Sequence, residues 1–416
     1  IAGRAVMGAG AALIMPATLS TITVVFPPDE RRRAIALWAG FAGAGGSFGP
    51  VVSGLLLERF WWGSTMLALL PVVALTAGTI ALICPPSRDD DSTPLDPVGA
   101  LLSLVALIAL LFAIIEAPEK GLAHPEVLTA IAVGVVMLAA FVAWERRTPH
   151  PMLPFDLFGD LRFRMGSGVI TMIFFIMFGW FFATTLYLQY VRDLSALQAS
   201  LAMLPFPLAM ILVAPRSARL AERFGSGRVI TAGFGAVAGS FAVLSLLSAD
   251  APYVLFGLTF ALMGSGMGIT TAPATGNIMS AVPPGKAGVG SAVNDTTREF
   301  GGALGIATIG SLVSAIYRAG MDSLPRSIPA EAAEAARESV GAAISTGRAL
   351  PGGELLVSQA IDSYSGAYRA TNIAAAVLAL VAALIVQRFF SQRKEAEANL
   401  VRPESMPELT GVSVRS

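Results

Sequence analysis

Three charged residues stand inside or at the edge of long apolar runs. Arg4 lies near the start of the first run, and Asp295 and Arg298 lie three residues apart at the start of another. A charge in a membrane-spanning segment is costly and indicates function by default. Residues three apart on a helix share a face and can pair. The chemistry that these residues suggest is ion pairing that gates or couples a movement.

Each of these residues also has a simpler interpretation. Arg4 can extend its side chain to the outer headgroups from the start of its helix. Asn294 or Asp295 can cap a helix, and pairing with Arg298 would then neutralise charge at the membrane interface. The glycine pattern that follows Arg4 favours the functional role there, and both interpretations of the pair stay open.

Residue types for catalysis or metal binding are scarce. The chain has one cysteine, Cys84, and two histidines, His124 and His150, so a His/Cys metal site is nearly excluded. No nucleophile–base pair or phosphate loop stands out. The formal net charge is zero, which argues against a nucleic-acid partner. We expect no enzyme activity, no cofactor and no metal.

Composition places most of the chain in lipid. It is 55% hydrophobic and 13% charged, whereas soluble domains are about 25% charged. A spanning helix needs about 20 apolar residues. We predict an all-α membrane protein with eleven spans, at Ile1–Phe26, Ala34–Leu57, Trp61–Cys84, Pro97–Ile115, Val127–Trp144, Met165–Val191, Ala196–Ala214, Arg228–Leu247, Pro252–Thr275, Thr297–Tyr317 and Ala367–Phe389.

The basic residues predict the orientation of these spans. Most arginines and lysines of the connecting segments fall on one side, including Arg31 to Arg33 and the stretch from Arg216 to Arg228. The side richer in basic residues is normally cytoplasmic. The C-terminus is therefore expected in the cytoplasm, and Ile1 on the outer face.

The chain contains an internal repeat with an offset of 256 residues. Residues 5–10, AVMGAG, match residues 261–266, ALMGSG, and the matches continue to Gly49 and Gly305. Spans one to three thus repeat as spans nine to eleven in the same direction, a parallel repeat. Spans six to eight have no counterparts, so we expect three further N-terminal spans and fourteen in all.

The repeat predicts the domain organisation. Residues 1–95 form the remainder of an N-terminal half, 96–145 an inserted two-helix pair and 146–164 a cytoplasmic linker. Residues 165–390 form a six-span C-terminal half with an outer loop at 319–366, and residues 391–416 form a tail that we expect to be disordered because it is rich in charge and proline.

Small residues recur where helices could approach closely. Gly46, Pro50 and Gly54 lie one turn apart on one face, and small residues permit close helix contact in lipid. Pro50 removes one backbone bond and permits a bend. General packing is the alternative role. The residues assigned to gating and packing are Gly8, Gly10, Pro16, Gly45, Gly46, Gly49, Pro50, Gly54, Gly301 and Gly305.

Four motifs resemble the fourteen-span drug:proton antiporters of the major facilitator superfamily (EmrB/QacA type). Arg4 to Pro16 is similar to the fourth-helix pattern Arg-x-x-Gln-Gly-x-Gly, with Met7 replacing Gln. Gly49 to Gly54 is similar to Gly-Pro-x-x-Gly-Gly, with Ser53 for the first of the paired glycines. Residues 218–228 resemble a degenerate Gly-x-x-x-Asp-Arg-x-Gly-Arg-Arg loop, and residues 294–305 resemble the start of the thirteenth helix.

The resemblance implies a major-facilitator bundle, with eleven spans present of fourteen. It implies a monomeric transporter in the plasma or inner membrane that exports small hydrophobic or cationic compounds in exchange for protons by alternating access. Arg4, Asp295 and Arg298 are the implied coupling residues.

The aromatic sixth span suggests a substrate cavity at Phe178, Tyr187 and Gln189, although core or lipid contact is the alternative for each. A facilitator or symporter of the same fold and a non-transporting ligand sensor are the alternative functions. Loss of efflux on collapse of the proton gradient would separate an antiporter from these.

Overall fold

The computed structural model describes residues 2–83, 96–149, 151–283, 286–322, 324 and 328–401. For residues 391–401, and for a few positions in the first two helices and elsewhere, only the backbone is described. The side chains of Arg4 and Pro16, and the surroundings of Gly46, therefore lie outside the described part. Residues 402–416 of the expected tail also lie outside it.

The first part of the chain forms α1 (Ala2–Val25), α2 (Pro28–Leu57), α3 (Ser64–Leu67) and α4 (Leu69–Ile83). Pro28 begins α2, where a missing N–H costs nothing, and Asp29 and Glu30 in its first turn complement the helix dipole. The third predicted span is interrupted between α3 and α4 at Ala68, so its first turn is a separate short helix.

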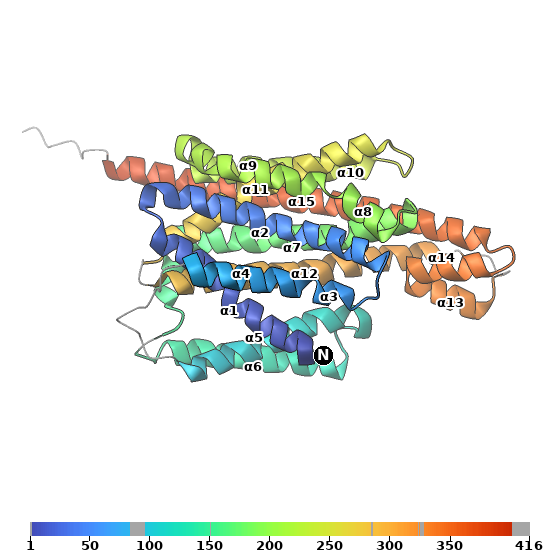
Figure 1. Ribbon diagram of the computed structural model, residues 1–416, viewed down its shortest axis with the longest axis horizontal. Coiled ribbons are helices and arrows are strands. Elements are labelled where there is room, and N and C mark those ends of the chain that lie inside the picture. The colour runs from blue at the N-terminus through green and yellow to red at the C-terminus, as the bar shows by residue number, and fades with distance from the viewer. Residues whose placement is uncertain are drawn as a thin grey trace, which may run out of the picture.

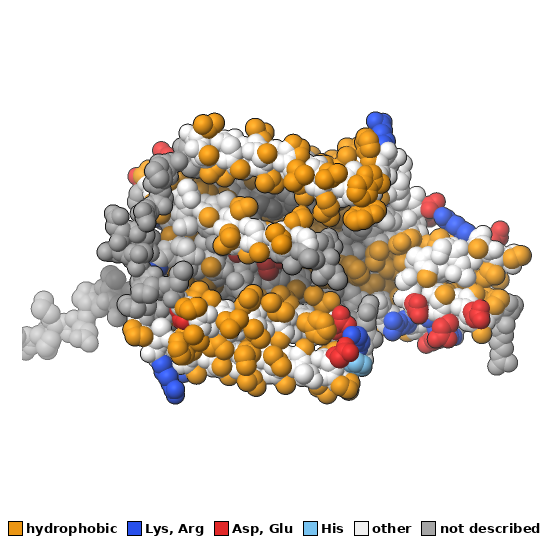
Figure 2. All heavy atoms as spheres, turned by 60° about the horizontal axis from the view of Figure 1, so that its bottom comes forward, with side chains coloured by type: hydrophobic (Ala, Val, Ile, Leu, Met, Phe, Trp, Pro, Cys, Tyr) orange, Lys and Arg blue, Asp and Glu red, His pale blue; other side chains and the backbone are white. Residues whose placement is uncertain are grey.

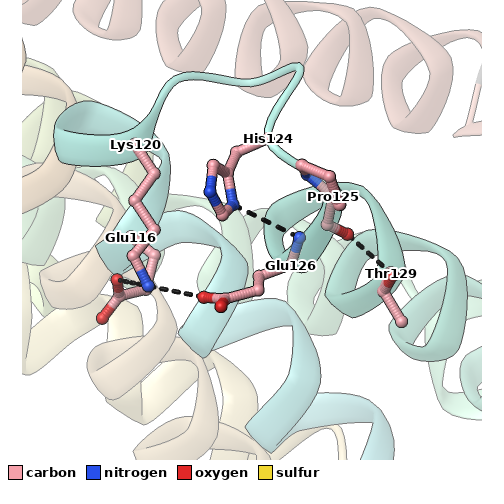
Figure 3. A network of polar contacts seen from close by, with 6 residues as sticks. All are labelled: Glu116, Lys120, His124, Pro125, Glu126 and Thr129. Carbon is pink, nitrogen blue, oxygen red and sulfur yellow. Dashed lines mark hydrogen bonds and ion pairs between the residues drawn. The ribbon is translucent and has the colours of Figure 1, made fainter.

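The predicted inserted pair is α5 (Pro97–Lys120) and α6 (Pro125–Glu145). Each helix has a proline in its first turn, and the residue before it, Asp96 or His124, accepts a hydrogen bond at the helix start. Lys120 closes the turn between them, with its Nζ 2.6 Å from Glu126 and 2.9 Å from Glu116 (Figure 3). Hydrogen bonds to Glu126 and then Glu116 raise the pKa of Lys120 above its usual range.

The remaining helices form the larger part of the bundle. The seventh predicted span is split into α8 and α9, and α9 continues to Phe224, so the basic stretch expected as a loop is mostly helical. Only Gly225 separates α9 from α10, with φ +87. The elements are η1 (Phe155–Gly159), α7 (Leu161–Leu186), η2 (Tyr187–Val191), α8 (Ala196–Ala202), α9 (Pro205–Phe224), α10 (Ser226–Leu246), α11 (Tyr253–Ser280), α12 (Ala287–Met321), α13 (Ala330–Glu338), α14 (Val340–Ala349) and α15 (Glu354–Val401).

The expected outer loop contains two short helices, α13 and α14. α15 begins at Glu354, earlier than the last predicted span, and ends at Val401 inside the segment expected to be disordered. Figure 1 shows the long helices lying roughly side by side, with α13 and α14 at one end of the bundle. Tyr317 on α12 holds α13 by donating a 2.8 Å hydrogen bond to the carbonyl of Ala336.

The buried core is formed mainly by the helices from α7 to α15. α12 packs on α7, α11 on α9, and α10 on α15. The first part of the chain meets this core through α2, which packs on α9 and α8, and through α1, which packs on α12. Helices far apart in sequence thus meet where α1 packs on α12 and α2 packs on α11, and the charged pair lies on this side of the bundle.

Ten helical segments within the described ranges are long and apolar enough to cross a membrane. The second predicted span lies in α2, a continuous helix of 30 residues that is not among those ten. Figure 2 shows hydrophobic side chains spread over the middle of one face, with most of its visible charged side chains near the ends. The structure is therefore an all-helical, multi-pass membrane fold, and a total of eleven or fourteen spans stays a prediction.

Candidate functional site

The centre of the candidate site is the guanidinium of Arg298 on α12. The residue is only 6% exposed. Its Cζ lies 4.5 Å from the ring centroid of Phe174 on α7 and 5.1 Å from that of Trp38 on α2. Aromatic faces attract a cation at these distances. The buried charge therefore lies between a residue of the first part of the chain, which comprises α1 to α4, and a residue of the later helices.

Asp295 accompanies Arg298 but pairs with it loosely. The distance from Arg298 Nη1 to Asp295 Oδ1 is 3.6 Å, longer than a hydrogen bond. Asp295 Oδ2 and Arg298 Nη1 have no hydrogen-bond partner among the described residues. Buried polar atoms are nearly always paired, so this site keeps spare capacity to accept and to donate.

A buried amide connects Asp295 to the next helix. Asn294 is fully buried, and its Oδ1 accepts a 3.1 Å hydrogen bond from Thr275 on α11. Its Nδ2 donates to Asp295 Oδ1 at 3.4 Å. This chain of contacts fixes the carboxylate from one side and leaves its second oxygen unpaired.

The capping interpretation of Asn294 and Asp295 is wrong. α12 begins at Ala287, not near Thr297 as the apolar run suggested, and Lys286 occupies its N-cap position. Both residues therefore lie about two turns inside the helix. The polar and glycine-rich start of this helix packs against α1, α7 and α11, and the length of an apolar run cannot reveal such contacts.

Two glycines let α12 approach α7 closely. A Cβ added at Gly301 would lie 2.3 Å from the carbonyl oxygen of Thr171, and one at Gly305 would lie 2.1 Å from that of Phe175. Any side chain there would collide with backbone, so these contacts require glycine. The same approach brings Phe174 within reach of Arg298.

The glycines of the first repeat behave differently. Gly54 packs on α8, with its added Cβ 3.1 Å from Leu197 Cα, whereas Gly8, Gly10, Gly45 and Gly49 have no atom within 4 Å of an added Cβ. Pro50 lies within α2 and is exposed. The packing expected at the four open glycines is therefore not formed by the described residues. Their repeat counterparts, Gly264, Gly266, Gly301 and Gly305, are all tightly packed.

The three predicted cavity residues are not brought together. Phe178 is half-buried and packs on Gly302. Tyr187 is buried and stacks on Tyr368, with ring centroids 4.2 Å apart. Gln189 lies in the π-helix η2. None of the three lines the cavity of about 970 Å³ that opens among α2, α9, α10, α11 and α15.

Sequence reasoning missed two of the residues that surround the charge. Trp38 lies in an otherwise ordinary apolar run, and its Nε1 donates a 3.0 Å hydrogen bond to Thr18 on α1. Thr275 ends a predicted span and gave no functional signal. Phe174 belongs to the aromatic-rich sixth span, but its spacing does not distinguish it from its aromatic neighbours.

A bundle of long apolar helices, with an ion pair inside it where its two parts meet, defines a multi-pass membrane protein. The chain belongs to the Major Facilitator Superfamily, because a sequence model of that family matches residues 1–306.

The relatives of the chain include drug-resistance transporters. It is 32% identical over 391 residues to the multidrug efflux pump LfrA of Mycolicibacterium smegmatis, covering 93% of this chain and 77% of LfrA. It is 30% identical to the tetracenomycin C resistance and export protein of Streptomyces glaucescens, covering 97% and 76% respectively. It is 36% identical to the methylenomycin A resistance protein of Streptomyces coelicolor, covering 74% of this chain but only 65% of that protein.

Proposed function

We propose that this transporter exports small hydrophobic or cationic compounds in exchange for protons by alternating access. The relatives are named for drug efflux and resistance, which supports export of drug-like compounds. The loose pairing of the buried Arg298 with the largely buried Asp295 is the observation that carries the proton-exchange part.

Asp295 is the proposed proton carrier. Its Oδ2 has no partner among the described side chains and backbone groups, so it can take up a proton without breaking an existing hydrogen bond. An ionised Asp295 attracts Arg298, and a protonated one does not. Proton uptake therefore leaves Arg298 as a buried charge without its ion pair with Asp295, against the rings of Trp38 and Phe174, which is unfavourable.

The change in charge would act on the contact between the two parts of the chain. Arg298 belongs to α12, whereas Trp38 belongs to α2. A change in the attraction between Asp295 and Arg298 would thus change the stability of this arrangement of the helices relative to another arrangement of the same helices. Arg4 is the proposed second coupling charge, since it precedes the glycine pattern of α1.

We also propose the fourteen-span, two-half architecture, a monomeric state, and a plasma or inner membrane location with the C-terminus in the cytoplasm. Helices equivalent to α7, α9 and α10 would cover the open glycines of α1 and α2. The packed counterparts on α11 and α12 support this. A Gly49→Leu variant should then lower the melting temperature of the intact transporter, and an unchanged value would contradict it.

Transport by proteoliposomes tests the exchange. Purified protein is reconstituted, a pH gradient is imposed, and uptake of the lipophilic cation ethidium is followed by fluorescence. Wild-type protein should concentrate ethidium until nigericin collapses the gradient. Asp295→Asn should lose gradient-driven uptake by about tenfold or more, as expected for a general proton-transfer group, yet keep ethidium exchange at equal pH.

Glu331→Gln is the control, because Glu331 is an exposed acid on α13, at the end of the bundle. It should transport like the wild type. Gradient-driven uptake by Asp295→Asn at the wild-type rate would rule out Asp295 as the carrier. Downhill flux that ignores the pH gradient would favour a facilitator, and ethidium binding without flux would favour a sensor.

A further inference from the structure

The cavity of about 970 Å³ is separate from the Arg298 site. It lies at the end of the bundle where α2 and α10 begin and α9 ends, and neither Asp295 nor Arg298 lines it. The helices around it occupy the upper part of Figure 1. Its volume is at the upper end of the range of small-molecule sites, about 300–1,000 Å³.

The charged residues that line this cavity are mostly basic. Arg31, Arg32, Arg162 and Arg228 line it, against one acid, Glu222. Arg32 already holds Glu222 at 3.4 Å. Arg162 is itself paired with Asp160 at 3.6 Å, so the positive field that would concentrate anions comes from Arg31 and Arg228.

Three buried polar groups of residues that line the cavity lack a partner among the described residues, and two of them can only donate. Asn277 is 9% exposed, and its Nδ2 forms no hydrogen bond. The buried Nε of Arg31 forms none either. An amide nitrogen and a guanidinium nitrogen can only donate. The missing partner of Asn277 and Arg31 must therefore be an acceptor. The third group, the Thr231 hydroxyl, can donate to the same acceptor.

The start of α10 adds further donors. Gly225 occupies its N-cap position and supplies no side-chain cap, and Ser226 and Gly227 line the cavity. The first N–H groups of a helix lack intrahelical partners, and they favour phosphate groups and other anions. These N–H groups surround one space together with Asn277 and Arg31. The three sets of donors belong to α10, α11 and α2.

The remaining wall has polar residues, among them Ser217, Ser280 and Gln387, and an apolar part. Ile35, Pro273, Met279 and Phe390 face the same space, so the cavity suits an anion attached to an apolar body. We propose that it binds the phosphate group of an anionic phospholipid, with the apolar wall against the glycerol and upper acyl chains. The bound lipid would bridge α2 to α10 and α11.

Native mass spectrometry of the purified full chain in detergent tests the proposal. Phosphatidylglycerol and phosphatidylcholine are titrated separately, and inorganic phosphate is added as a competitor. We expect phosphatidylglycerol to bind at least about tenfold more tightly than phosphatidylcholine, as for loss of one charge-assisted contact. Millimolar inorganic phosphate should displace little of it.

Variants locate the site. Arg31→Ala and Asn277→Leu should each weaken phosphatidylglycerol binding by about tenfold. Arg219→Ala removes an equal charge from α9 but lies outside the cavity lining, so it should bind like the wild type. Melting temperatures without lipid show that each variant is folded, and Arg228→Gln replaces any variant that is not.

Equal binding of both lipids, or an equal loss in Arg219→Ala, would overturn the proposal. Full displacement by inorganic phosphate would overturn the lipid as the source and leave a site for free anions. Because none of these measurements involves flux, their outcome is independent of the proposed proton exchange.

Discussion

The guanidinium carbon of Arg298 lies 5.1 Å from the ring centre of Trp38. The two residues are far apart in the chain, because Arg298 lies on α12 and Trp38 on α2. Trp38 is itself held by its hydrogen bond to Thr18 on α1. Arg298 is the only strongly buried arginine of the described part, and it is thus held by an aromatic ring that belongs to the first part of the chain.

Replacing Trp38 should impair transport more than stability. A cation–π contact contributes about 0.5–2 kcal/mol, so Trp38→Leu should lower gradient-driven ethidium uptake by about two- to thirtyfold in proteoliposomes. Trp62→Leu is the control, since Trp62 is exposed and contacts no described cation. Equal uptake by both variants would show that the Arg298–Trp38 contact has no part in transport.

Enlarging Gly305 should destabilise the bundle. In Gly305→Ala the new methyl group would meet the carbonyl of Phe175, and overpacking of this kind costs about 1–3 kcal/mol. Thermal unfolding in detergent should show a lower midpoint. Gly168→Ala, on α7 with open space around it, should unfold like the wild type or slightly above it. A Gly305→Ala midpoint equal to that of Gly168→Ala would mean that α12 and α7 lie further apart than described.

The Lys120 cluster predicts a pH dependence at the α5–α6 turn. Its contacts with Glu126 and Glu116 raise the pKa of Lys120, so the folded state binds this proton more tightly than the unfolded state. The stabilisation is then fully present below the ordinary lysine pKa of about 10.4. It is lost as the pH rises through the higher folded-state value.

Lys120→Gln should therefore lower the melting midpoint slightly, by about 1 °C, as for other exposed ion pairs. The difference from wild type should persist from neutral pH to about pH 10 and fade above it. Lys286→Gln removes an exposed lysine that forms no ion pair among the described residues, so it should show no such trend. A difference for Lys120→Gln that grows at high pH would contradict the assignment.

Much of the architecture follows from the sequence because lipid imposes simple rules on it. A backbone in lipid must satisfy its own hydrogen bonds, so long apolar runs such as that of α5 become helices. Pro97 and Pro125 begin helices because a proline is tolerated in the first turn. Asp295 and Arg298 share a face because three residues make most of one helical turn.

Local pattern could not decide what meets across the bundle. Gly49 and Gly305 occupy equivalent places in the repeat, yet only Gly305 has a backbone against it. Trp38 lies near Arg298 only because α2 packs on α11 while α1 packs on α12. The hydrogen-bond donors that line the cavity of about 970 Å³ come from α2, α10 and α11. Such contacts join residues distant in the chain, and their energies depend on distance and burial, which exist only once the helices have packed.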